Sequence, residues 1–253
     1  MNDTAEFMNS EKICVIVPTY NNSGTIADVL SRIYRITQNI IVVNDGSDDD
    51  THRILQDIGF SLTVVEYKHN RGKGYALKCG FRKALSMGFS NAVTIDSDGQ
   101  HFPEDMPILI NAYREHPGAL IIGVRNLCED NMPSGNTFAN KFSNFWFCVQ
   151  TLVKLDDTQS GYRLYPISRI NASWIFTSRY EAELELLVFS AWHDIDIRQV
   201  DVRVYYPSPE ERVTHFRPGY DFFRISILNT LLCMGALFYY LPKLIYNNSP
   251  LNN

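Results

Sequence analysis

Residues 92–100 read AVTIDSDGQ, and this stretch decides the fold that we expect for the chain. Its first four residues are apolar or β-branched, which is typical of a buried strand. Two carboxylates follow at once, and side chains at i and i+2 of an extended chain project to the same side. Carboxylate and amide oxygens are the ligands that Mg²⁺ and Mn²⁺ prefer. We therefore predict a metal site of Asp96, Asp98 and Gln100, with a solvated Asp-Gly turn as the alternative.

Outward from this stretch, short apolar runs alternate with segments of helical periodicity. Strands are expected at 13–17, 40–43, 62–67, 92–95 and 120–123, and helices at 25–35, 48–59 and 73–87 and from 103. Strands that alternate with helices of about 10 to 15 residues predict an α/β fold, a doubly wound, mostly parallel sheet flanked by helices.

Polar residues gather where the predicted strands end. Thr19-Tyr20-Asn21 follows the first strand, Asp45 the second, and the acidic pair the fourth. In such sheets ligands bind beyond the carboxyl ends of the strands, so these side chains should converge. Asp45 is suited to accept hydrogen bonds from a nucleoside ring or ribose. The basic loop 69–74 is suited to a phosphate or ribose, although a solvated turn is its alternative.

The pattern changes after residue 123. A polar loop is expected at 126–136, an aromatic-rich helix at 137–152, a helix at 181–192 and a half-exposed strand around Val200, Val202 and Val204. Residues 225–241 form a segment without charged side chains. The length of this segment falls short of the about 20 apolar residues that span a bilayer. We expect domains at 1–218 (catalytic) and 219–253, an apolar C-terminal helix that associates with a membrane. A spanning helix and a core helix are the alternatives.

Charge and composition narrow the class of function. The 253-residue chain has a formal net charge of −5, so no nucleic-acid partner is expected. Its five cysteines have no metal-ligand spacing, and residues 1–12 form no apolar signal segment. Cations before the apolar helix suit an acceptor phosphate or an anionic membrane surface. They are Arg125, Arg212, His215 and Arg217.

Four motifs together resemble the family 2 inverting glycosyltransferases. They are PTYN at 18–21, NDGS at 44–47, NRGKG at 70–74 and DSDGQ at 96–100. DTQSGYR at 157–163 is similar to a motif of the polyprenyl-phosphate branch, typified by dolichol-phosphate mannose synthase. Ser160 and Arg163 depart mildly from that motif, which often has cysteine and lysine there.

The resemblance implies a GT-A fold of the nucleotide-diphospho-sugar transferase type and a role for each matching position. The nucleotide-sugar site would comprise Pro18, Tyr20, Asn21, Asp45, Arg71, Lys73 and Asp96. Mg²⁺ or Mn²⁺ would lie at Asp96, Asp98 and Gln100, and loop 126–136 would close over the acceptor phosphate. The expected donor is of the GDP-mannose or UDP-glucose type, and the acceptor is undecaprenyl or dolichyl phosphate. We expect the protein on the cytoplasmic side of the membrane, peripheral or anchored through its C-terminus.

The expected chemistry is metal-dependent, inverting transfer of a hexose. A lipid phosphate is largely ionised near neutral pH, so a strong general base is not required. Asp98 and Asp157 are the predicted catalytic residues: Asp157 would orient or deprotonate the acceptor, with helix capping as its alternative. Two other functions stay open, a family 2 transferase acting on a glycan or another lipid, and a non-catalytic nucleotide-sugar-binding module.

Overall fold

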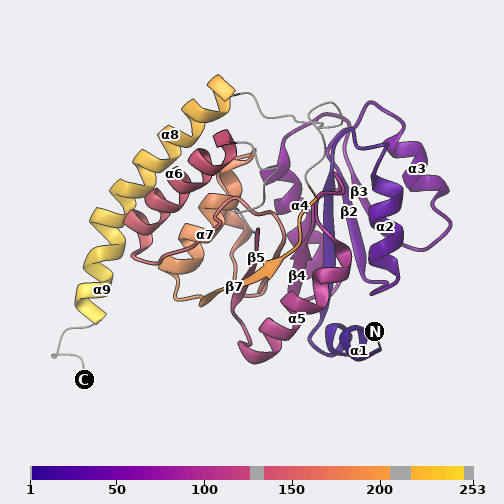
Figure 1. The fold of residues 1–253 in the computed structure, drawn as a ribbon, viewed down its shortest axis with the longest axis horizontal. Helices are drawn as coiled ribbons and strands as arrows, with labels where there is room; N and C mark the ends of the chain where they lie inside the picture. The colour runs from indigo at the N-terminus through magenta and orange to yellow at the C-terminus, as the bar shows by residue number, and fades with distance from the viewer. Residues whose placement is uncertain (1, 126–133, 206–217, 248–253) are drawn as a thin grey trace.

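A seven-stranded sheet forms the centre of the computed structural model, which describes residues 2–125, 134–205 and 218–247 (Figure 1). The strand order is β3-β2-β1-β4-β6-β5-β7. The strands are β1 (Ile13–Thr19), β2 (Ile40–Asn44), β3 (Thr63–Glu66), β4 (Asn91–Thr94), β5 (Leu120–Arg125), β6 (Arg163–Tyr165) and β7 (Ile197–Val202). All pairings are parallel except those of β6, which runs antiparallel to β4 and β5. The predicted fold class is confirmed.

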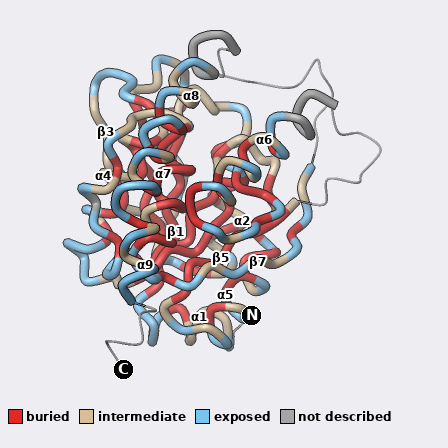
Figure 2. The backbone as a smooth tube through the Cα atoms, turned by 90° about the vertical axis from the view of Figure 1, so that its left-hand side faces the viewer, coloured by how far each residue is buried: buried red, intermediate tan, exposed pale blue. Residues whose placement is uncertain are grey.

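Helices cover both faces of this sheet, because its central strands β1, β2 and β4 bury side chains on both sides. Along β1, Cys14 and Ile16 face one core, while Val15 and Val17 face the other, as the two-residue period of a strand requires. The helices of the first core are α4 (Lys73–Ser86), α6 (Ser134–Thr151), α7 (Glu181–Trp192) and α8 (Pro218–Gly235), and those of the second are α1 (Asn2–Ser10), α2 (Ile26–Tyr34), α3 (Thr51–Asp57) and α5 (Met106–Glu115). Figure 2 shows the buried residues gathered between these layers.

Two local predictions differ from the structure, and one helix was not predicted. Residues 2–10 form helix α1, which buries Met8 completely although the segment reads as polar. The helix that follows β5, α6 (Ser134–Thr151), begins three residues earlier than the expected 137. The strand expected around Val200, Val202 and Val204 ends at Val202, and Val204 instead forms an isolated bridge with His101.

The chain ends in a long helical segment that packs along α6 and α7 (Figure 1). It consists of α8 (Pro218–Gly235), a π-helical turn (Ala236–Tyr240) and α9 (Leu241–Asn247). Its inner face buries residues at helical spacing, namely Leu228, Leu232, Ala236 and Tyr240. By length and composition, Phe223–Asn247 is also long and apolar enough to cross a membrane. Helix α8 begins at Pro218, and the division into domains at 1–218 and 219–253 stays a prediction.

The topology fixes where a ligand site is expected. From β1 the chain moves outward through β2 to β3, and then returns to place β4 on the other side of β1. Such a reversal opens a crevice at the carboxyl ends of the two central strands. The loops after β1, β2 and β4 therefore meet at one edge of the sheet. These are the loops that carry the predicted site residues.

Candidate active site

The acidic motif follows β4 and is fixed by the loop after β1. The pairing of β1 and β4 continues to Ile95, whose N–H donates to the Ile16 carbonyl at 3.2 Å. Asn22 Nδ2 donates to Ser97 Oγ at 2.8 Å, and Thr25 Oγ1 donates to the Ser97 carbonyl at 2.6 Å. Ser97 is buried, whereas both flanking aspartates are partly accessible. The loop therefore turns its serine inward and leaves the two carboxylates at the edge.

Asp98 lies in an environment suited to a cation. Its Oδ1 accepts a hydrogen bond from the Gln100 N–H at 3.0 Å. Burial, and then the neighbouring Asp96 carboxylate, raises the pKa of Asp98 to about 6. Two carboxylates this close repel each other, and a divalent cation between them would remove that repulsion. Hard oxygen ligands of this kind fit Mg²⁺ or Mn²⁺.

The protein ligands alone do not complete a metal centre. Among residues 2–125, 134–205 and 218–247, no group of three or more His, Cys, Asp or Glu side chains is arranged to hold a metal ion. Magnesium sites that act on phosphates commonly take one or two carboxylates and complete their coordination with water and phosphate oxygens. Asp96, Asp98 and Gln100 fit that kind of site.

Asp45 holds the basic loop in place. It is 3% exposed, and its two carboxylate oxygens accept the N–H groups of Arg71 at 2.8 Å and Gly72 at 2.7 Å. Burial raises the pKa of Asp45 although these hydrogen bonds oppose the shift. The structure thus gives Asp45 a structural role besides the predicted contact with the nucleoside.

Gly72 lets the basic loop pass close to the start of α7. Its φ is +94°, and a Cβ atom there would lie 2.4 Å from the Ser178 carbonyl oxygen. Only glycine combines this backbone conformation with such a close approach. The packing brings α7 beside Lys73, the first residue of α4.

Lys73 joins the basic loop to the acidic motif. Its Nζ lies 2.8 Å from Asp96 Oδ1 and 3.1 Å from Glu183 Oε2 of α7. Burial disfavours the charged form of Asp96, but the Lys73 ammonium outweighs it and leaves the pKa of Asp96 below its usual value. Burial raises the pKa of Glu183, and Lys73 offsets only part of that shift. The predicted donor residues Lys73 and Asp96 are therefore in direct contact.

The residues after β1 connect neighbouring loops. Pro18 is buried within β1, and Tyr20 is half-buried beyond its end. Asn21 has a φ of +54° and exchanges two hydrogen bonds with Asp48, at 2.6 Å and 2.9 Å. Asn21 therefore clamps the loop after β1 to the loop after β2, which begins with Asp45.

Arg125 and Asp157 form an ion pair. Arg125 Nε and Nη2 donate to the two carboxylate oxygens of Asp157 at 2.5 Å and 2.8 Å. Asp157 is fully buried, and its Oδ1 also accepts the N–H groups of Gln159 and Ser160. Asp157 therefore organises its own loop rather than capping a helix. Arg125 was expected to bind the acceptor phosphate, and in the structure its guanidinium binds the Asp157 carboxylate. Arg212, His215, Arg217 and loop residues 126–133 lie outside the described residues.

Arg163, the last residue of the DTQSGYR motif, is fully buried beneath the site. Its guanidinium donates to the carbonyl oxygens of Thr158 at 2.9 Å, Ser160 at 2.6 Å and Glu183 at 2.8 Å. Thr158 in turn is bound by Ser143 and Asn144 of α6. The motif is thereby joined to α6 and α7, which fixes the backbone at Gly161.

His101 lies beside the acidic motif but is buried. Burial lowers its pKa to about 4, so the ring is neutral near pH 7. The imidazole packs against Tyr162, with ring centroids 5.2 Å apart. These contacts favour a structural role for His101.

Gly161 gives the first testable prediction, because a methyl group there would enter the Lys73 cluster. A Cβ atom would lie 2.7 Å from Asp96 Oδ2 and 2.8 Å from Lys73 Nζ. We expect Gly161→Ala to weaken donor binding about 5- to 150-fold, since overpacking costs about 1–3 kcal/mol. Calorimetric titration with a nucleotide sugar measures the effect. Gly24→Ala is the control, since a Cβ there meets nothing within 4 Å. Unchanged affinity in Gly161→Ala would contradict the close packing.

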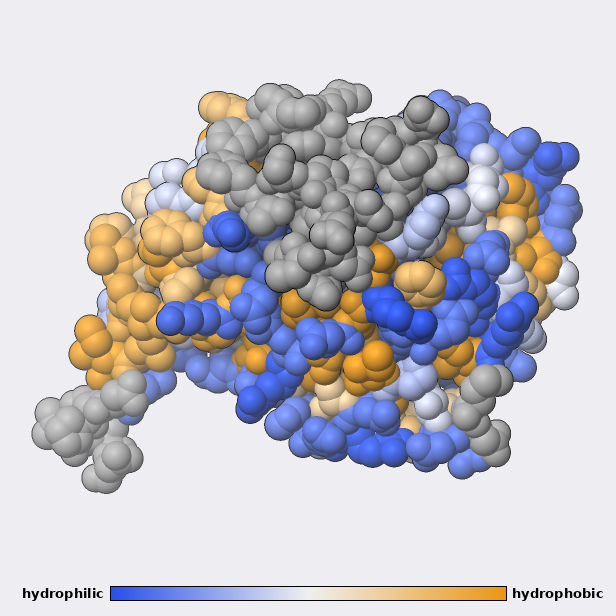
Figure 3. Space-filling view, viewed as in Figure 1, coloured by the Kyte–Doolittle hydropathy of each residue, from blue (hydrophilic) through white to orange (hydrophobic). Residues whose placement is uncertain are grey.

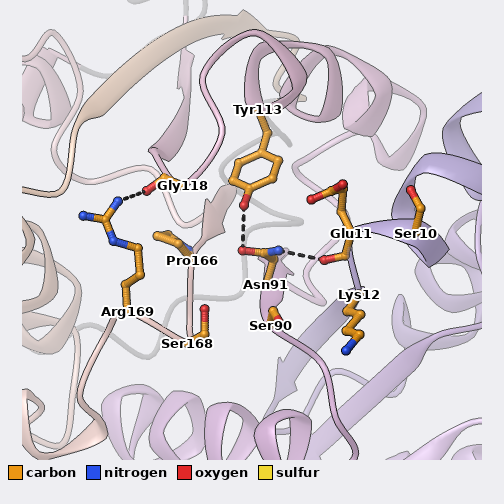
Figure 4. Close-up of a pocket in the computed structure, with 10 residues that line it drawn as sticks. All are labelled: Ser10, Glu11, Lys12, Ser90, Asn91, Tyr113, Gly118, Pro166, Ser168 and Arg169. Atoms are coloured by element: carbon orange, nitrogen blue, oxygen red, sulfur yellow. Dashed lines mark hydrogen bonds between the residues drawn. The ribbon is translucent and has the colours of Figure 1, made fainter.

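A hollow of about 310 Å³ lies at the opposite end of the sheet (Figure 4). It is lined by residues before or at the start of β1, β4 and β5 and by residues after β6. Tyr113 Oη donates to Asn91 Oδ1 at 3.0 Å, and Asn91 Nδ2 donates to the Glu11 carbonyl at 2.8 Å. Arg169 Nη1 donates to the Gly118 carbonyl at 2.8 Å. These polar groups bind one another, so the hollow is a structural junction.

A doubly wound sheet with an acidic motif at its topological switch point and a basic loop beside it defines a GT-A-type glycosyltransferase, an enzyme. The sequence comparisons agree. The chain belongs to glycosyl transferase family 2, whose model matches residues 14–155.

Similar proteins include lipid-linked sugar transferases. The UDP-N-acetylglucosamine–dolichyl-phosphate N-acetylglucosaminyltransferase of Methanococcus voltae is 27% identical over 87% of this chain and 97% of its own length. The polyprenol monophosphomannose synthase of Mycolicibacterium smegmatis is 27% identical over 73% of this chain and 74% of its own. Glucosyl-3-phosphoglycerate synthase from Mycobacterium tuberculosis, solved with Mn²⁺, UDP and phosphoglyceric acid, shares the fold. Its TM-score is 0.64 at 19% identity, covering 93% of this chain and 81% of that one.

Sequence reasoning missed Glu183 and the partner of Asp157. The signal for Glu183 was present, because Glu181, Glu183 and Glu185 are charged residues in an otherwise apolar helix and all three are buried. Buried carboxylates require partners, so their presence in a core helix marks an ion-pair network or a site.

Proposed function

We propose that this enzyme transfers a hexose, with inversion, from a nucleoside-diphosphate sugar to a polyprenyl phosphate such as undecaprenyl or dolichyl phosphate. The transfer would depend on Mg²⁺ or Mn²⁺ and take place at the cytoplasmic side of the membrane. The observation that carries the proposal is the meeting of Asp96, Asp98 and Lys73 at the switch point of the sheet. A fold alone does not determine function, whereas this site supplies the charges that transfer from a nucleoside-diphosphate sugar requires.

The donor half of the proposal follows from charge. Lys73 and the N-terminus of α4 favour the negative charge of a diphosphate. The cation held by Asp96, Asp98 and Gln100 would neutralise negative charge on the departing nucleoside diphosphate. Tyr20 and Asp45 lie where the nucleoside would bind, with Pro18 and Asn21 supporting them. Arg71, whose guanidinium stacks on Tyr75, completes the basic loop.

The acceptor half is supported by the relatives and by the surface. The name of the first relative includes dolichyl phosphate, and the name of the second includes polyprenol monophosphomannose. Apolar side chains gather over the side of the molecule formed by α8 and α9 (Figure 3). The hydrocarbon chain of a polyprenyl phosphate would need such an apolar surface beside the site. Arg125, Arg212, His215 and Arg217 would bind its phosphate, with Arg125 held by Asp157.

Positioning accounts for most of the proposed mechanism. The acceptor phosphate is already ionised, so the reaction is a direct displacement at the anomeric carbon, with the acceptor oxygen attacking as the diphosphate leaves. Holding the two substrates in line lowers the barrier, and fixed charges stabilise the leaving group. Asp157 contributes by orienting the acceptor through Arg125.

Transfer to extractable lipid tests the function. We would incubate the protein with Mn²⁺, undecaprenyl phosphate and radiolabelled GDP-mannose, UDP-glucose or UDP-N-acetylglucosamine in turn. The proposal expects label in the organic phase with one of these donors. Label in a water-soluble glycan would favour a family 2 transferase with a different acceptor. Donor binding without turnover of any acceptor would favour the binding module.

Membrane association predicts that acidic substitutions on the outer face of the C-terminal helix release the protein from vesicles. Leu231 is 60% exposed and Phe238 is 73% exposed. We expect Leu231→Glu/Phe238→Glu to reduce co-sedimentation with anionic vesicles at least about tenfold, because each large apolar side chain contributes about 1.5–3 kcal/mol when buried. Val64→Glu on the far edge strand is the matched control, since Val64 is 40% exposed. Equal sedimentation of the wild type, the double variant and Val64→Glu would show that this face does not bind the membrane.

A further inference from the structure

Glu183 lies in the site although none of the motifs that predicted the site includes it. It belongs to α7, and its side chain is 8% exposed. Its Oε2 is 3.1 Å from Lys73 Nζ, which is also 2.8 Å from Asp96 Oδ1. One ammonium group thus lies between two carboxylates from different parts of the chain.

The surroundings leave little freedom to this cluster. Gly161 closes over it so tightly that a Cβ atom would lie 3.1 Å from Glu183 Oε1. Arg163 donates to the Glu183 backbone carbonyl and so fixes the first turn of α7. The Glu183 side chain is therefore confined beside Lys73 by Gly161, and its backbone is fixed by Arg163.

The two carboxylates differ in what else they can reach. Asp96 is 26% exposed and belongs to the acidic motif, so a bound cation and diphosphate would compete with Lys73 for it. The Glu183 side chain is only 8% exposed and belongs to α7 rather than to the acidic motif. When Asp96 is engaged by the donor, Glu183 is the carboxylate that stays with Lys73.

We propose that Glu183 is a positioning residue for the sugar donor, which holds the Lys73 ammonium at the acidic motif while Asp96 binds the incoming cation and diphosphate. This inference rests on the proposed function, because it requires a nucleotide-sugar donor. Without Glu183, Lys73 would be anchored by Asp96 alone and would follow it or swing away. Donor affinity would therefore fall although the residue touches no substrate.

The same helix supplies a matched control. Glu185 is also buried, and its Oε2 accepts hydrogen bonds from the N–H groups of Phe176 and Thr177, both at 3.0 Å. Glu181 binds Arg224 of α8 at 2.7 Å. Of the three buried glutamates of α7, Glu183 is the one that contacts Lys73. Neutralising Glu185 therefore removes a buried negative charge of the same helix but leaves the contacts of Lys73 unchanged.

Calorimetric titration of the full chain with Mn²⁺ and the donor found in the transfer assay tests the inference. We expect Glu183→Gln to weaken donor binding about 10- to 100-fold, the range of hydrogen bonds between charged groups. Glu185→Gln should bind the donor like the wild type. Glu183→Asp, which keeps the charge with a shorter reach, should bind with intermediate affinity. In a Lys73→Met background, Glu183→Gln should cause no further loss, because the two residues would act as one unit.

The possible failures are distinguishable. A wild type that binds no nucleotide sugar would overturn the proposed function and this inference with it. A wild type that binds, with Glu183→Gln equally tight, would overturn the inference alone. An equal loss from Glu183→Gln with and without Lys73 would also overturn it, since Glu183 would then act on the fold rather than through Lys73. Thermal melts of Glu183→Gln and Glu185→Gln report any shared loss of stability.

Discussion

We expect Asp98→Ala to lower kcat/KM about 10²- to 10³-fold, the usual effect of removing one group that stabilises charge in a transition state. Asp98 is partly accessible at the carboxyl end of β4, and its contact with the Gln100 N–H leaves oxygen lone pairs for a cation. Without it, a cation would keep only Asp96, which Lys73 also contacts, and the uncharged Gln100. Steady-state transfer measured over a range of Mn²⁺ and Mg²⁺ concentrations gives the size of the effect.

Asp50→Ala serves as the control for this experiment. Asp50 is an exposed aspartate that pairs with Arg53 at 3.3 Å, outside the acidic motif. Its loss should leave turnover close to that of the wild type. If Asp98→Ala turned over donor at the wild-type rate, or if a chelator had no effect on the wild type, the metal site would have to be abandoned.

The general position of the site was predictable because strand ends follow from local pattern. Ile95 and Val43 end apolar runs, and the polar residues after them had to lie at one edge of a parallel sheet. Individual contacts were not predictable in this way. Asp45 lies 26 residues from Arg71, and Lys73 lies 110 residues from Glu183. A spacing rule acts within one element, whereas these pairs depend on how separate elements pack.

In the fold, too, some elements were predictable from local sequence patterns and others depend on packing. The parallel strands were read from their β-branched runs, but β6 spans only Arg163–Tyr165 and is too short to show a period. Helix α1 carries few apolar residues, and its stability comes from burying Met8 against the second core. Packing of this kind overrides local propensity, and a single sequence does not reveal it.

Asp157→Ala is expected to lower the free energy of unfolding by about 3–5 kcal/mol, because breaking a buried ion pair leaves an unpaired charge behind. Arg125 is 17% exposed, and Asp157 is its bidentate partner. Replacing both, in Arg125→Met/Asp157→Ala, should restore part of this loss, since no charge then remains unpaired. Urea unfolding of the two single variants and the double variant measures the coupling.

The activities of Arg125→Met, Asp157→Asn and the double variant Arg125→Met/Asp157→Asn separate two roles for Asp157. If it acts through Arg125, then Asp157→Asn and Arg125→Met should lower kcat/KM by similar factors, and the double variant should be no worse than either. KM for the acceptor should rise in all three, because the guanidinium would no longer be held toward the phosphate. A general base would give another pattern: Asp157→Asn would lose kcat by a large factor while Arg125→Met kept it. The burial of Asp157 and its contacts with Arg125, Gln159 and Ser160 favour the first pattern.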